Sequence, residues 1–133
     1  MDRSRVGAPS AKGVPPEIEF ADYLPHVRRR WLAEQAAVER RREVAWEAAR
    51  EVATLLRVRF GAERVVVFGS LIHPGSFSER SDVDLAVSGI PPSAFFKAWA
   101  AAGEACPFEL DLVDLRDCSP ALRLLIEKEG IEP

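Results

Sequence analysis

Two short apolar runs separated by a polar loop constrain this chain most strongly. The first, residues 65–68, ends in Gly69-Ser70, and the second, residues 83–87, begins beside the two aspartates Asp82 and Asp84. Side chains alternate between the faces of a strand, so Asp82 and Asp84 share one face while the apolar side chains share the other. The pattern therefore predicts a strand that packs on a core with one face and presents two carboxylates on the other.

The segment around Gly69-Ser70 adds a second ingredient. Two adjacent carboxylates repel each other unless a cation lies between them, and an all-oxygen site of this kind favours a divalent metal. A glycine at a strand end permits a sharp turn and a close approach of a ligand, and a short helix that starts at Ser70 would offer free N–H groups to an anion. A phosphate site beside a metal-binding carboxylate pair is the layout of a nucleotide site.

A third carboxylate is expected on the same sheet face. The alternation over residues 108–113 predicts a strand with Phe108 on the core side and Asp111 on the polar side, whereas Asp114 has the opposite parity. Three aspartates on one face can hold two Mg²⁺ about 3.5–4 Å apart, the arrangement used for in-line phosphoryl or nucleotidyl displacement.

These motifs together resemble the minimal nucleotidyltransferase (MNT) family of the polymerase-beta-like nucleotidyltransferase superfamily. The resemblance covers roughly residues 45–130 and consists of Gly-Ser, a variable loop, Ser-Asp-x-Asp-Leu and a later strand aspartate. The chain departs from the family in the loop, where His73-Pro74-Gly75 stands in place of the common arginine and glycine. Arg80 and His73 are the candidates to replace that arginine.

The resemblance implies a Mg²⁺-dependent nucleotidyltransferase that moves a nucleoside monophosphate, with AMP expected, from a nucleoside triphosphate to an acceptor by a two-metal mechanism. The expected metal-binding and catalytic residues are Asp82, Asp84 and Asp111, and the expected nucleotide-binding and phosphate-binding residues are Gly69, Ser70, Ser81 and Arg80.

The resemblance further implies the antitoxin of a HEPN/MNT toxin–antitoxin pair, which binds its HEPN-type partner and adds AMP to it. Two alternatives stay open: a non-catalytic MNT-fold module that neutralises its partner by complex formation, and a nucleotidyltransferase that acts on a small molecule of the aminoglycoside type. The motifs leave open which nucleoside triphosphate and which acceptor are used, as well as self-association into a homo-oligomer.

Composition restricts the setting. The chain has 133 residues, enough for one modest domain, and a formal charge of −3, which argues against nucleic acid as the main partner. Its two cysteines, Cys106 and Cys118, lack metal-site spacing. No run approaches the roughly 18 apolar residues of a membrane span, so a cytoplasmic protein is expected.

The predicted domain organisation is a flexible tail over residues 1–25 and a single nucleotidyltransferase domain over residues 26–133. Within the domain, a long N-terminal helix precedes a catalytic core over residues 61–133. The expected fold class is α/β (α+β), with helices mainly on one face of a small mixed sheet. The expected strands are residues 64–68, 82–88 and 108–113, and the expected helices are residues 26–60, 93–102 and 120–129, with Phe95, Phe96 and Trp99 in the core and Gly103 at a helix end.

Overall fold

The computed structural model describes residues 24–133. The chain divides into two compact units, one up to Glu39 and one from Arg40 to Pro133. The tail predicted over residues 1–25 lies outside the described residues except for its last two, which begin the first helix. The predicted single domain over residues 26–133 stays a prediction.

Helix α1 spans Leu24–Phe60. Its sequence contains no glycine or proline after Pro25, and proline is well tolerated in a first helical turn. In the second unit the helix runs along the sheet and buries one apolar stripe at helical spacing, comprising Ala45, Ala49, Val52 and Leu56. Gly61, with φ +76°, ends the helix, and the amides of Gly61 and Ala62 donate to the carbonyl oxygens of Arg57 and Leu56.

Three strands form one mixed sheet in the order β2-β3-β4. β2 (Arg64–Phe68) pairs antiparallel with β3 (Val83–Ser88), which pairs parallel with β4 (Leu110–Asp114). Two short 3-10 helices, η1 (Gly69–Ile72) and η2 (Pro74–Ser76), lie in the loop between β2 and β3. On the outer edge of β2, Ile131 near the C-terminus adds a single antiparallel bridge to Val67.

The register gives the two sheet faces different roles. Val67, Leu85 and Leu112 are cross-strand partners, and these buried side chains project toward α1. Val66, Phe68 and Ala86 project to the opposite face, where they form a cluster with Ile126 of α3 (Pro120–Glu129). α3 therefore covers part of the second face and leaves the ends of β3 and β4 open beside the loop from Gly69.

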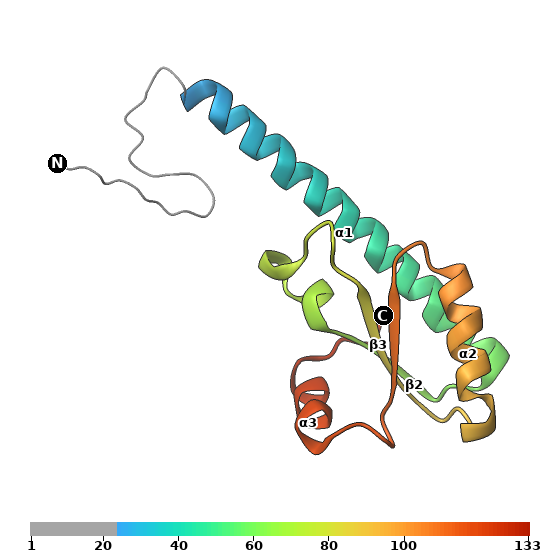
Figure 1. Ribbon diagram of the computed structural model, residues 1–133. Helices are drawn as coiled ribbons and strands as arrows, with labels where there is room; N and C mark the ends of the chain where they lie inside the picture. Colours follow the sequence, from blue (N-terminus) through green and yellow to red (C-terminus); the bar gives the residue numbers. More distant parts are fainter. Residues whose placement is uncertain (1–23) are drawn as a thin grey trace. The chain divides into compact units, whose positions relative to one another are not determined.

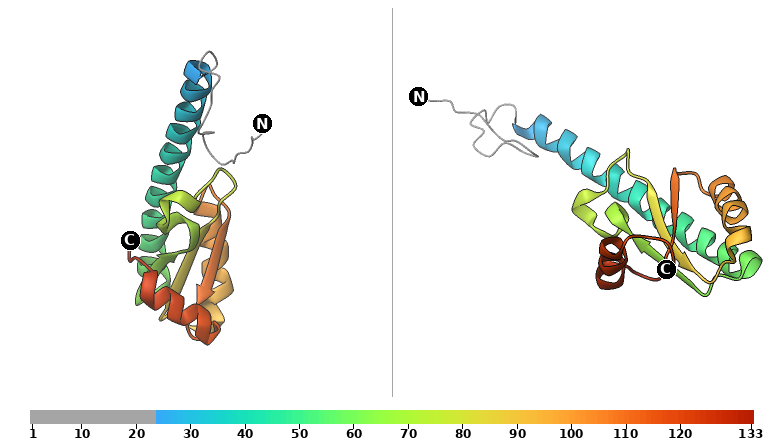
Figure 2. Two further views of the ribbon diagram at one scale, coloured as in Figure 1. Left: turned by 90° about the vertical axis from the view of Figure 1, so that its left-hand side faces the viewer. Right: turned by 60° about the horizontal axis from the view of Figure 1, so that its bottom comes forward.

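Helix α2 spans Pro92–Ala105, and α2 and α3 lie on opposite flanks of the sheet (Figures 1 and 2). The Trp99 indole N–H donates to the carbonyl oxygen of Leu110 at 3.2 Å, which fixes α2 against β4. The predicted end of this helix at Gly103 is wrong, because α2 continues to Ala105. The predicted burial of Phe96 is also wrong, since its side chain is 75% exposed.

The predicted third strand, residues 108–113, is also displaced, because β4 spans Leu110–Asp114. The remaining bounds agree with the sequence pattern to within two residues, and the small mixed sheet with a long N-terminal helix confirms the predicted fold class. Among the described residues, no helix is long and apolar enough to cross a membrane.

Candidate functional site

Register places two of the three predicted aspartates side by side. Asp84 on β3 is the direct cross-strand partner of Asp111 on β4, and on its other side it is the partner of Phe68 on β2. Asp82 precedes β3 by one residue and, by the alternation of a strand, lies on the same face as Asp84. Asp84 is half-buried, whereas Asp82 and Asp111 are exposed. The three carboxylates thus form a row at the open end of one sheet face.

The carboxylates influence one another electrostatically. Burial, followed by repulsion from Asp111 and then from Asp82, raises the pKa of Asp84 from 3.8 to about 6. A carboxyl group in such surroundings is stabilised by taking up a proton or by a nearby cation. Asp114 has the opposite parity and does not belong to this row. A hydrogen bond from Arg116 lowers the pKa of Asp114 below its usual range.

The row is suited in its chemistry to a hard cation, since carboxylate oxygens are the ligands that Mg²⁺ prefers. Within residues 24–133, no group of three acidic, histidine or cysteine side chains is already arranged to hold a metal ion. The three aspartates share a face and an electrostatic field, and side-chain rotation would be needed to bring their oxygens onto one ion.

Gly69 lies directly against the row. It has a φ of +80°, and a Cβ atom at this position would stand 2.3 Å from Oδ2 of Asp84. Only glycine satisfies both the left-handed backbone and the contact. The turn that begins η1 thus brings the backbone of Gly69 and Ser70 next to the Asp84 carboxylate.

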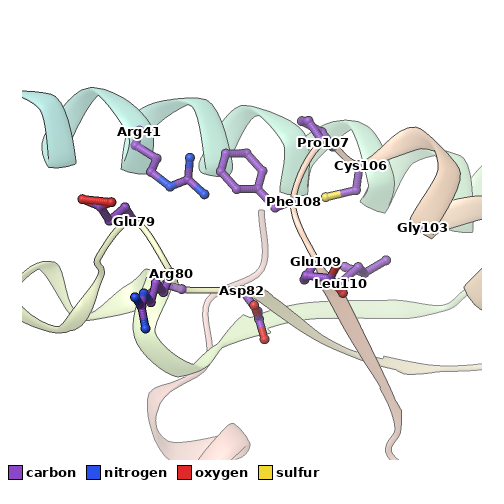
Figure 3. Close-up of a pocket in the computed structure, with 11 residues that line it drawn as sticks. Arg41, Glu79, Arg80, Asp82, Gly103, Cys106, Pro107, Phe108, Glu109 and Leu110 are labelled. Carbon is purple, nitrogen blue, oxygen red and sulfur yellow. The ribbon is translucent and has the colours of Figure 1, made fainter.

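The loop before β3 holds the other predicted residues. The Ser81 hydroxyl accepts a hydrogen bond from the Ser78 amide at 2.9 Å, so it shapes the loop. His73 is turned to α3, where its Nε2 lies 3.0 Å from a carboxylate oxygen of Glu129. The Arg80 side chain is exposed, and Figure 3 shows it beside Asp82 at the same pocket.

A pocket of about 660 Å³ adjoins the row at Asp82. Its wall includes Arg41 from α1 and Phe108 from the segment before β4, with the Arg41 guanidinium carbon 4.8 Å from the centre of the Phe108 ring. Figure 3 shows this pair above Asp82 and Arg80. The sequence pattern predicted Phe108 in a strand and in the core, and it gave no signal that Arg41 lines a pocket. β4 begins instead at Leu110, which leaves Phe108 half-buried at the pocket.

Comparison with known proteins identifies the fold. No family model and no curated protein matches the chain. A solved structure provisionally named a minimal nucleotidyltransferase is 29% identical, with a TM-score of 0.53, over 75% of this chain and 96% of that chain. A toxin–antitoxin structure with AMP-PNP is 26% identical, with a TM-score of 0.53, over 63% of this chain and 70% of that chain.

A third solved structure contains a tri-AMPylated Shewanella oneidensis HEPN toxin in complex with its MNT antitoxin. It is 22% identical, with a TM-score of 0.50, over 66% of this chain and 70% of that chain, and it supports the fold alone. The chain thus shares the fold of minimal nucleotidyltransferases and is similar to them in sequence, and the aspartate row beside a strand-end Gly-Ser agrees with that similarity.

Proposed function

We propose that this protein is a Mg²⁺-dependent nucleotidyltransferase that moves AMP from ATP to a hydroxyl group of a HEPN-type partner protein, as the antitoxin of a toxin–antitoxin pair. The observation that carries the proposal is the placement of Asp84 between its strand partner Asp111 and the backbone of Gly69. The carboxylate row and the Gly69-Ser70 turn then lie against each other. The expected site of action is the cytoplasm.

Asp82, Asp84 and Asp111 would hold Mg²⁺, which when bound would offset the negative charge of the triphosphate. The backbone N–H groups of Gly69 and Ser70 would bind the β- and γ-phosphates. The Arg80 guanidinium, exposed at the mouth of the site, would contribute a charge-assisted hydrogen bond to a phosphate oxygen. Ser81 would act by holding the loop that presents Arg80.

Asp111 is the candidate to receive the proton of the acceptor hydroxyl. It lies on β4, on the far side of Asp84 from Gly69, so an acceptor beside it would face the α-phosphate opposite the departing pyrophosphate. An in-line displacement requires this opposite placement. No covalent intermediate with the protein is needed, because positioning and charge stabilisation supply the catalysis.

The partner assignment rests on the related structures. One relative is a toxin–antitoxin complex with AMP-PNP, and a more distant one contains an AMPylated HEPN toxin with its MNT antitoxin. The first complex supports a nucleotide substrate and a toxin partner for this chain, and the HEPN type of that partner is what the sequence resemblance implies.

The test uses the full chain, Mg²⁺, ATP labelled at the α-phosphate and the protein encoded by the adjacent gene. Label should pass to that protein and should be lost with EDTA and in the Asp82→Asn and Asp84→Asn variants, while the exposed Asp117→Asn variant should retain activity. If the two site variants keep Mg·ATP affinity and transfer, the proposal fails. A tight unlabelled complex would indicate the binding module, and label on a small molecule would indicate the third class.

A further inference from the structure

The carbonyl oxygen of Leu71 needs a hydrogen-bond donor from outside its own turn. Leu71 lies in η1, and the residue as a whole is 0% exposed, so water does not reach this oxygen. In a 3-10 helix a carbonyl accepts from the amide three residues further on, and that residue here is Pro74, which has no N–H. A buried carbonyl without a partner is strongly destabilising, so another group must donate to it.

Arg42 of α1 supplies that donor. Its Nε donates to the Leu71 carbonyl oxygen at 3.0 Å in a partly buried hydrogen bond. Arg42 also extends the stripe of α1 that contains Ala45 and Ala49, because it precedes Ala45 by three residues. The buried members of that stripe are apolar, whereas the position that meets the backbone of η1 carries a polar side chain.

The position of η1 matters for the carboxylate row. η1 begins at Gly69, where an added Cβ would stand 2.3 Å from Oδ2 of Asp84, so the backbone has no room to move closer. Its start has no side-chain cap, and the buried Leu71 side chain and the Arg42 hydrogen bond hold it from outside. Without that hydrogen bond, the Leu71 carbonyl could regain a partner only if η1 moved toward water, which would also displace Gly69 and Ser70 from Asp84.

We infer that Arg42 is a positioning residue of the nucleotide site, whose Nε–H holds η1 so that the amides of Gly69 and Ser70 stay in place beside Asp84. The inference rests on the proposed function, which assigns these amides to the β- and γ-phosphates. Arg42 acts through the backbone of η1, and its N–H group rather than its positive charge carries the role. The requirement arises where the loop departs from the minimal nucleotidyltransferase pattern, because Pro74 belongs to that departure.

Two substitutions separate the N–H group from the charge. Glutamine carries its amide nitrogen on Cδ, as arginine carries Nε, so Arg42→Gln keeps a donor at the same place and removes the charge. Arg42→Met has a similar length and keeps neither. The control Arg50→Met removes an exposed arginine of α1 that pairs with Glu47 instead.

The first test measures transfer of labelled AMP by the full chain with Mg²⁺, ATP and the protein encoded by the adjacent gene. Arg42→Met should raise the KM for ATP about tenfold, the scale of one lost hydrogen bond to a buried group, and leave the KM for the acceptor protein unchanged. Arg42→Gln and Arg50→Met should both keep a KM for ATP near that of the unmodified chain.

The second test needs no turnover. The His73 amide donates to the Ser70 carbonyl at 3.1 Å, so its hydrogen exchange, followed by NMR, reports on the closure of η1. Exchange at this amide should be about tenfold faster in Arg42→Met and unchanged in Arg42→Gln. The Leu115 amide, which donates to the Val87 carbonyl at 2.8 Å, is the reference within the sheet and should keep its rate.

The outcomes separate this inference from the proposed function. If the unmodified chain neither binds Mg·ATP nor transfers AMP, the proposed function fails, while the exchange rates still decide whether Arg42 holds η1. If the chain is active and Arg42→Met keeps its KM for ATP, the inference is overturned. It is also overturned if Arg42→Gln is as impaired as Arg42→Met, which would assign the role to the charge, or if exchange at His73 and Leu115 accelerates equally, which would show a loss of global stability.

Discussion

Replacing Asp84 by asparagine should stabilise the metal-free protein. The carboxylate is half-buried beside two others, and its pKa is raised to about 6 by burial, then by Asp111 and by Asp82. At neutral pH the fold must therefore keep an ionised group in surroundings that disfavour it. After allowance for screening by water at a half-exposed site, its removal should add about 1–2 kcal/mol to the free energy of unfolding.

The gain should depend on pH with a definite sign. The folded protein binds a proton at Asp84 more tightly than the unfolded chain, whose group has the ordinary value of 3.8. The stabilisation from that protonated carboxyl is fully present below 3.8 and is lost as pH rises through about 6. The difference between Asp84→Asn and the unmodified protein should therefore be small at pH 4, grow between pH 4 and 6, and stay constant above that range.

Urea unfolding followed by circular dichroism at pH 4.5 and 7.5 measures this difference, with EDTA present. Glu104→Gln, a change at an exposed carboxyl group on α2, is the control and should alter neither value. The Asp84→Asn variant should lose AMP transfer, so that the more stable protein is the less active one. An Asp84→Asn protein that is no more stable at pH 7.5, or equally stabilised at both pH values, would refute the electrostatic reasoning.

Three further changes probe the surroundings of the row. Gly69→Ala should lower the free energy of unfolding by about 1–3 kcal/mol, because a methyl group would meet the Asp84 carboxylate and the backbone has φ +80°. Gly75→Ala, with nothing within 4 Å of the added methyl group, should be well tolerated. Equal denaturation midpoints for the two variants would contradict this. His73→Ala removes an exposed pair with Glu129, so it should lower the free energy of unfolding by less than about 1 kcal/mol and leave AMP transfer intact. A large loss of activity would instead assign His73 a role at the phosphates. Arg80→Ala should raise the KM for ATP with little change in thermal stability, and an unchanged KM would remove it from the phosphate site.

Local pattern predicted the elements whose ends are marked by strong signals. β2 ends where Gly69 takes a left-handed backbone, and α3 begins at Pro120 after the Ser119 side chain accepts a hydrogen bond from the Leu122 amide. Gly103 misled the prediction for α2, because a glycine inside a helix costs only about 1 kcal/mol and the helix can continue through it.

Tertiary contacts account for what the pattern missed. The alternation over residues 108–113 treats Phe108 as a core residue of a strand, yet the strand starts at Leu110 and the ring lies beneath Arg41, a residue distant in sequence. Phe96 has the spacing of a buried helix residue but stacks on Trp99 at the surface. The stretch of sequence around Phe108 does not contain Arg41, and the stretch around Phe96 does not reveal that this side chain stays exposed.

The candidate site itself follows from the sheet register, and the register follows from the apolar side chains. Phe68, Asp84 and Asp111 are cross-strand partners on β2, β3 and β4, and Gly69 follows Phe68 directly in the chain. Like charges in direct cross-strand contact are destabilising, so the row is held by the burial of Val67, Leu85 and Leu112 in the neighbouring row on the other face. A slip of one residue in β3 would turn its aspartates into the core and expose Leu85, which costs far more than the repulsion. Burial of the apolar side chains therefore fixes a register in which the carboxylates repel each other, and a bound cation would reduce that repulsion.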